Sequence, residues 1–106
     1  MNRSIERTLH PKPPCPLASY FERAVALDPQ SAGSWYNLGL LYSRRSAPRR
    51  AVEAYERTLA LEPANQKARL NLAVQYARLG EQAKAVEQYR LVVAVLENEE
   101  KRAMFS

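Results

Sequence analysis

The sequence is poor in the residues from which metal, redox and nucleotide sites are built. Its single cysteine, Cys15, excludes an intramolecular disulfide and a multi-cysteine zinc site. Its single histidine, His10, excludes most histidine-based metal sites. The glycines stand far apart, at positions 33, 39 and 80, and form no glycine-rich phosphate loop. These shortages predict a chain that uses no metal and no cofactor.

Long hydrophobic runs and clustered acids are missing as well. The longest uncharged apolar run, 91–96, is far shorter than the roughly 20 residues that a membrane span needs. The N-terminal stretch has arginines but no apolar segment after them, which argues against a secretory signal. The glutamates are scattered instead of grouped with a base or nucleophile, so we predict no catalytic residue and no enzyme. A reducing, cytoplasmic location is the simplest fit.

What is present fits one small folded domain. The chain has 106 residues, of which 46% are hydrophobic and 25% are charged, as in ordinary globular proteins. Lysine and arginine number 16 against 11 aspartates and glutamates, which gives a net charge of +5. This excess of positive charge favours an acidic partner over a basic one.

The most informative feature is an internal repeat. Residues 32–65 and 66–99 align at an offset of 34, with nine identities where about two are expected by chance. Within each segment the shared residues are spaced for one face of a helix. The identical pairs are Asn37/Asn71, Leu38/Leu72, Tyr42/Tyr76, Arg44/Arg78, Ala51/Ala85, Val52/Val86, Glu53/Glu87, Tyr55/Tyr89 and Ala60/Ala94.

Helix-breaking residues recur between these segments. Pro48 suits the first turn of a helix, and Gly80 suits the end of one. Pro29 and Pro63 push the residue before them out of the helical region. The pattern therefore predicts five helices and no strand, at 17–28, 32–45, 48–61, 66–79 and 82–100.

These residues resemble the tetratricopeptide repeat. The first full unit has Trp35, Leu38, Gly39 and Tyr42 in one helix, followed by an alanine, a tyrosine and a proline at the family's spacing. The second unit departs from the pattern at Arg69, Ala73 and Glu97. The resemblance covers 17–99 and implies an all-α, helix-turn-helix repeat solenoid of about two and a half units. Small Gly39 and Ala73 are expected to let paired helices approach, while the tyrosines at 42, 55, 76 and 89 fill the space between units.

The ends of the array are predicted to be unusual. Residues 17–31 read as the second helix of a partial unit, and 1–16 as a disordered arm, because its prolines break helix geometry. We expect the units to be 32–65 and 66–99, with 100–106 as a helical extension or tail. The apolar surface expected near the last helix consists of Val92, Val93, Val95 and Leu96.

The resemblance also implies a binding surface. In this family the first helix of each unit lines a concave groove, and its mixture of apolar, amide and cationic side chains suits a peptide or helix of a partner protein. Asn37, Asn71 and Lys67 match positions that grip a C-terminal carboxylate in chaperone-binding relatives, but the first unit lacks a basic residue near Gly33 and Tyr36. The predicted peptide-binding residues are Tyr36, Asn37, Leu40, Arg44, Lys67, Leu70, Asn71, Val74 and Arg78.

A cluster of arginines marks the turn between the helices of the first unit. Arg49 and Arg50 begin a helix, where the helix dipole opposes positive charge, and no local contact is expected to offset this cost. An external anion would offset it, and a turn that is simply solvated is the alternative. With Arg45 they form a candidate anion contact. Nucleic acid is not the expected anion, because neither a long basic stripe nor interleaved aromatic residues accompany them.

The sequence thus predicts a non-enzymatic protein-interaction module, an adaptor or assembly scaffold that binds a peptide or helix in its concave groove. The alternative is a structural role, in which the uncapped ends of the solenoid associate into a dimer or a stack.

Overall fold

The computed structural model describes residues 16–105 and is built from helices alone over that range. The helices are α2 (Pro16–Leu27), α3 (Ala32–Arg44), α4 (Pro48–Leu61), α5 (Gln66–Arg78) and α6 (Gln82–Phe105). The predicted all-α class is confirmed, and the helices begin and end within about one residue of the predicted limits, except that α6 continues to Phe105. The predicted arm, with His10 and Cys15, lies outside the described residues apart from Pro16.

The ends of the helices repeat at the same offset of 34 as the sequence. Ser31 caps α3 by accepting a hydrogen bond from the Ser34 amide at 3.3 Å, and Asn65 caps α5 by accepting one from the Ala68 amide at 3.0 Å. Pro48 occupies the first turn of α4, as predicted. Both turns inside a unit use one left-handed residue, Ser46 with φ 58° and Gly80 with φ 80°.

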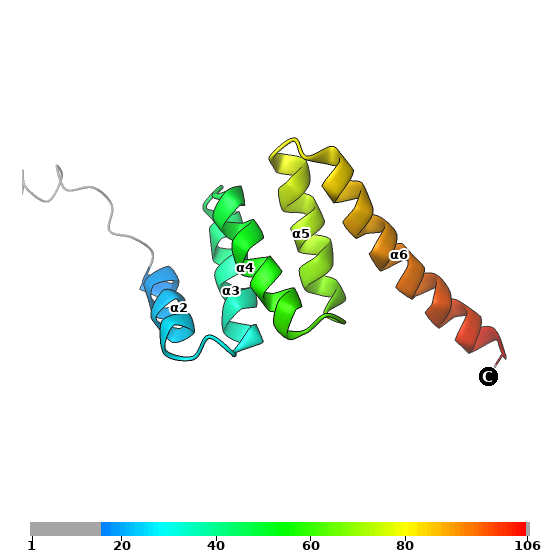
Figure 1. Ribbon diagram of the computed structural model, residues 1–106, viewed down its shortest axis with the longest axis horizontal. Coiled ribbons are helices and arrows are strands. Elements are labelled where there is room, and N and C mark those ends of the chain that lie inside the picture. Colours follow the sequence, from blue (N-terminus) through cyan, green and yellow to red (C-terminus); the bar gives the residue numbers. More distant parts are fainter. Residues whose placement is uncertain (1–15, 106) are drawn as a thin grey trace, which may run out of the picture.

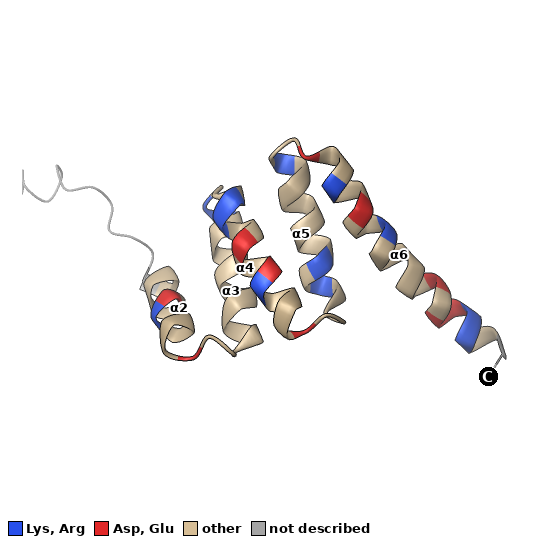
Figure 2. Ribbon diagram, viewed as in Figure 1, with Lys and Arg blue, Asp and Glu red and all other residues tan. Residues whose placement is uncertain are grey.

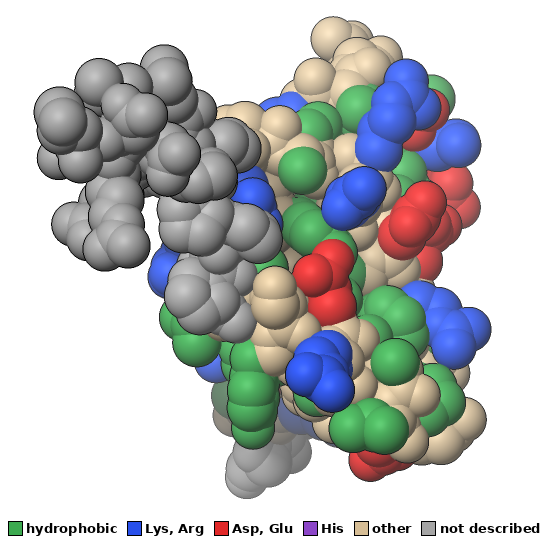
Figure 3. Space-filling model, turned by 90° about the vertical axis from the view of Figure 1, so that its left-hand side faces the viewer, with side chains coloured by type: hydrophobic (Ala, Val, Ile, Leu, Met, Phe, Trp, Pro, Cys, Tyr) green, Lys and Arg blue, Asp and Glu red, His purple; other side chains and the backbone are tan. Residues whose placement is uncertain are grey.

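Each helix packs mainly against its neighbours in the chain, so the molecule is an elongated row of helices and is not globular. Figure 1 shows α2 to α6 following one another along the long axis, and Figure 3 views the molecule from its α2 end. The principal extents are 74 × 31 × 20 Å and the radius of gyration is 18.2 Å, whereas a compact domain of this length has about 13 Å. This is the geometry of a solenoid, in which each unit is stabilised by the units next to it.

One core runs through this row. Some of its buried positions recur in both units, as in the pairs 38/72, 42/76 and 51/85, and Trp35, Tyr36 and Leu59 pack against it while partly exposed. The buried members of the core are Val25, Leu38, Tyr42, Ala51, Val52, Ala54, Tyr55, Ala68, Leu72, Tyr76 and Ala85.

Two details differ from the prediction. Tyr89 does not fill an interior space as Tyr42, Tyr55 and Tyr76 do, because its side chain is 37% exposed. The expected apolar surface on α6 is divided: Val92 is buried, whereas Val93 and Leu96 are exposed. The reason is that residues three and four apart share a helix face, so adjacent valines cannot all point the same way.

Candidate functional site

The first helices of the two units, α3 and α5, lie beside each other and are joined by side-chain hydrogen bonds. The Asn71 amide donates to the Tyr36 hydroxyl at 3.1 Å. The Gln75 amide donates to the Ser43 hydroxyl at 2.9 Å, and Arg78 donates to the Ser43 carbonyl at 3.2 Å. We call the surface formed by the nine predicted peptide-binding residues of α3 and α5 the first-helix face.

The nine residues of this face fall into three groups. Tyr36, Asn71 and Arg78 hold α3 and α5 together through the bonds above. Leu40 and Val74 are half-buried. The rest present exposed side chains with apolar, amide and cationic chemistry: Asn37, Arg44, Lys67 and Leu70.

The two asparagines that are equivalent in sequence have different surroundings. Asn71 is half-buried and bonded to Tyr36, whereas Asn37 is exposed. Sequence reasoning also missed Ser43 and Gln75, which share the junction with Arg78. A buried glutamine inside a helix gives no signal of its partner, because the partner lies 32 residues away in the chain.

Charge is segregated between the two kinds of helix. Neither α3 nor α5 contains an aspartate or a glutamate, and their charged residues are Arg44, Lys67, Arg69 and Arg78. Figure 2 shows this for α5, where basic segments occur alone, and contrasts it with α6, which carries both signs. The acids of the described residues lie on α2, α4, α6 and the turns. The first-helix face therefore has no carboxylate of its own to neutralise its cations.

A second set of polar contacts ties each first helix to the helix before it. The Tyr42 hydroxyl donates to Glu22 at 2.6 Å, and the Tyr76 hydroxyl donates to Glu56 at 3.2 Å. A cation lies over each ring in turn, Arg50 at 5.8 Å from the Tyr42 centroid and Lys84 at 5.7 Å from the Tyr76 centroid. Because the tyrosine–glutamate bond and the cation over the tyrosine ring both recur at the offset of 34, they belong to the architecture of the repeat.

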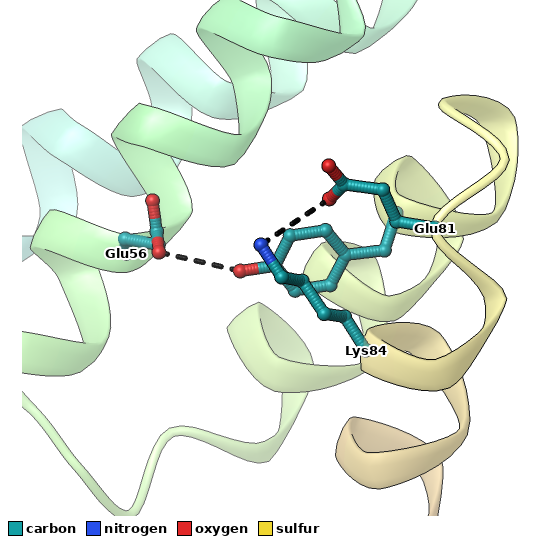
Figure 4. A network of polar contacts seen from close by, with 4 residues as sticks. Glu56, Glu81 and Lys84 are labelled. Carbon is teal, nitrogen blue, oxygen red and sulfur yellow. Dashed lines mark hydrogen bonds and ion pairs between the residues drawn. The ribbon is translucent and has the colours of Figure 1, made fainter.

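Figure 4 shows the second of these contacts, where Glu56 approaches from α4 and Lys84 reaches back to Glu81 at 3.7 Å. Burial raises the pKa of Tyr76 to about 12, and the charge and hydrogen bond of Glu56 add to the rise. Burial likewise raises the pKa of Tyr42, with Glu22 adding to it and Arg50 opposing it. Both hydroxyls are therefore protonated donors at neutral pH.

The arginine cluster has local partners that the sequence did not reveal. The expectation that Arg50 lacks a local contact is wrong, because it lies over the Tyr42 ring and acts against the rise in the pKa of the Tyr42 hydroxyl. Arg49 borders a hollow that also contains Glu53 and Glu56. An anion contact by Arg45, Arg49 and Arg50 stays a prediction, and the carboxylates beside Arg49 weaken it.

Arg69 stands where the family pattern has a tryptophan, and it makes an equivalent hydrogen bond. In the first unit the Trp35 indole donates to the Pro29 carbonyl at 2.9 Å, with Arg57 over its ring. In the second unit Arg69 donates to the Pro63 carbonyl at 2.8 Å and also to Gln88 at 3.0 Å. Each side chain closes the turn that precedes its own helix.

Comparison with known families agrees with this geometry. Two family models, both described as tetratricopeptide repeat, match residues 20–53 and 39–98. The chain belongs to the tetratricopeptide repeat family. The matched segments do not coincide with 32–65 and 66–99, so those unit limits stay a prediction. No curated protein matches the chain by sequence.

Among solved structures, this tetratricopeptide repeat chain resembles two described as crystal structures of MamA. The first shares 32% identity with a TM-score of 0.71, and covers 82% of this chain and 49% of its own. The second shares 31% identity with a TM-score of 0.71, and covers 84% of this chain and 47% of its own. The chain thus spans about half the length of these structures.

The described range offers neither a metal site nor a helix that could span a membrane. Residues 16–105 contain no group of three or more histidine, cysteine, aspartate or glutamate side chains arranged to hold a metal ion. No helix in this part of the chain is both long and apolar enough to cross a bilayer.

The repeats support a protein-interaction or scaffold module as the general function.

Proposed function

We propose that the first-helix face binds an extended, acidic peptide segment of a partner protein. The observation that carries the proposal is the segregation of charge: α3 and α5 expose cations and contain no acid. A carboxylate on an approaching peptide would find Lys67 and Arg44 exposed, without an internal carboxylate to compete for them.

The face also offers groups for the rest of a peptide. Exposed Asn37 can donate to a backbone carbonyl and accept from a backbone amide, while Leu70, which is 44% exposed, offers apolar contact. The bonds from Asn71 to Tyr36 and from Arg78 to Ser43 fix α3 against α5 before any ligand arrives. A face that is already ordered loses little entropy when it binds.

The test uses two double variants of matched composition. Asn37→Ala/Lys67→Ala removes two exposed side chains of the first-helix face, and Asn98→Ala/Lys101→Ala removes the same two residue types from an exposed part of α6. The probe is an array of synthetic 12-residue peptides of graded acidic content, read by fluorescence. We expect the intact chain and the α6 variant to prefer acidic peptides, and the first-helix variant to bind them about tenfold more weakly.

Salt separates this mode of binding from apolar docking. Binding through exposed ion pairs should weaken as salt is raised from 50 to 500 mM, because the screening length falls from about 14 Å to about 4 Å. Equal binding by both double variants, or equal preference for neutral and acidic peptides, would contradict the proposal.

A further inference from the structure

Helix α6 carries an apolar strip that nothing among residues 16–105 covers. The strip consists of Val86, Tyr89, Val93 and Leu96, whose side chains are 47%, 37%, 49% and 54% exposed. Their spacing of three and four residues places them on one side of the helix, in the a and d positions of two heptads. The first three border a shallow hollow of about 290 Å³ that Arg90 and Glu97 also line.

The repeat itself shows that these positions normally face another helix. An offset of 34 relates Val86, Tyr89 and Val93 to Val52, Tyr55 and Leu59 of α4. There the first two are buried and the third is partly buried, in the core to which α5 contributes. The strip on α6 thus occupies positions that form a helix interface on α4.

Within the part of the chain that the structure describes, no further first helix in the same register covers the strip. Residues 100–105 occupy the positions at which such a helix would begin, and they remain part of α6. In the first unit, α4 ends shortly before Pro63. The equivalent residue of α6 is Glu97, which does not interrupt a helix, so α6 continues past this position.

The charge beside the strip also differs from that of an ordinary repeat contact. Glu22 and Glu56 accept a hydrogen bond from the tyrosine of the following helix, but the equivalent residue of α6 is Arg90. A cation at this position calls for a carboxylate on the partner helix. Seven residues along the same edge, α6 carries such a carboxylate, Glu97.

We propose that two copies of the chain associate through α6 in an antiparallel pair. The two-fold axis crosses α6 near residues 94 and 95, so that Val93 packs on Leu96 of the second copy and Arg90 pairs with Glu97 of the second copy. Symmetry makes each contact twice. This inference does not rest on the first-helix face and goes beyond the peptide-binding role.

The orientation follows from which edge of the strip is free. In a parallel pair of helices, the e positions of one chain face the g positions of the other. In such a pair Arg90 and Glu97 would face the g positions Ala85 and Val92, which are buried on the side that packs against α5. The next g residue, Glu99, is exposed but faces neither of them. In an antiparallel pair e faces e, so Arg90 and Glu97 can meet. The second copy also has room, because residues 96–104 are exposed on all sides of α6.

The experiment is a charge swap read by molar mass. Wild-type protein at about 10 µM to 1 mM is examined by sedimentation equilibrium, and we expect a monomer–dimer equilibrium. Arg90→Glu and Glu97→Arg should each weaken dimerisation about tenfold or more, because two attractive pairs become two repulsive ones. Val93→Glu should give a monomer, and Arg102→Glu, on an exposed part of the same helix, should behave as wild type.

The decisive sample is an equimolar mixture of the Arg90→Glu and Glu97→Arg variants. In a mixed pair both charge contacts are attractive again, so the mixture should regain the wild-type dimer, as should the double variant alone. Far-UV circular dichroism confirms that each variant is folded. A wild-type monomer at 1 mM, a dimer that survives Val93→Glu, a mixture that stays monomeric, or masses that grow beyond the dimer would each overturn the proposal.

Discussion

At the scale of single residues, a close approach between α3 and α4 depends on the absence of a side chain at Gly39. A Cβ atom at this position would lie 2.6 Å from Cε1 of Tyr55, whose ring is buried and cannot move aside. We expect Gly39→Ala to lower the free energy of unfolding by about 1–3 kcal/mol, because overpacking outweighs the better helix propensity of alanine. Urea denaturation measures the change.

The second unit supplies the matched control, since Ala73 occupies the equivalent position. Its expected partner by register, Tyr89, lies 37% exposed, so a methyl group fits there. Ala73→Gly should cost about 1–2 kcal/mol, because it loses helix propensity and the burial of one methyl group. A Gly39→Ala variant that is as stable as the wild type would mean that α3 and α4 can separate without loss.

Because of Tyr55, the free energy of unfolding should depend on pH in the alkaline range. Burial raises its pKa from 10.0 in the unfolded chain to about 12, with the charge of Tyr36 adding to the rise and Arg78 opposing it. A raised pKa means that the folded state holds its proton more tightly. This stabilisation is therefore complete below pH 10 and is lost as the pH rises through 12.

Denaturant titrations at pH 8 and pH 11 should accordingly show a fall in the free energy of unfolding. Tyr55→Phe removes the titrating hydroxyl and should reduce that fall, while Tyr76, whose pKa is also raised to about 12, maintains part of it. An unchanged pH dependence in Tyr55→Phe would show that the hydroxyl of Tyr55 is hydrated in the folded protein.

The tyrosines also show where sequence reasoning reached its limit at this scale. Their recurrence at 42 and 76 correctly predicted buried, inter-helix positions. Their bonds to Glu22 and Glu56 were not predicted, because each partner lies 20 residues away and reads as an ordinary surface acid. A local sequence pattern indicates which face of a helix is buried, but it does not indicate which polar atom of another helix lies opposite that face.

At the scale of helices, periodicity and breakers located every element of the described chain. Proline and glycine act on the backbone of their immediate neighbours, so Pro48, Pro63 and Gly80 gave the limits of α4 and the end of α5 without tertiary information. The division of the α6 valines into buried Val92 and exposed Val93 was missed, since it depends on the direction from which α5 approaches.

The length of α6 follows from one residue, and restoring the family's proline should shorten it. We expect Glu97→Pro to end the helix near Leu96 and to lower the helical circular dichroism signal by about a tenth. The midpoint of urea unfolding at low protein concentration should stay the same, because residues 96–104 are exposed and add little to the core. A lower midpoint would show that the extension stabilises the repeats.

At the scale of the whole molecule, a row of helices has no residue in contact with all the others. Stability is then a sum of local terms, and damage at an end should spread less than damage in the middle. The register provides two equivalent positions with which to compare them. Val25 joins α2 to the core at one end, and Leu59 packs against the core from α4, near the centre.

We expect each truncation, Val25→Ala or Leu59→Ala, to lower local stability by about 1–3 kcal/mol. The two variants should differ mainly in how many helices lose protection from exchange. In hydrogen exchange, Val25→Ala should speed exchange in α2 and leave α4 and α5 protected. Leu59→Ala should speed exchange in α4 and α5 together, because opening this interface separates the two halves of the row. Equal acceleration along the chain in both variants would instead indicate that the helices unfold as one cooperative unit, with α2 as essential to it as α4.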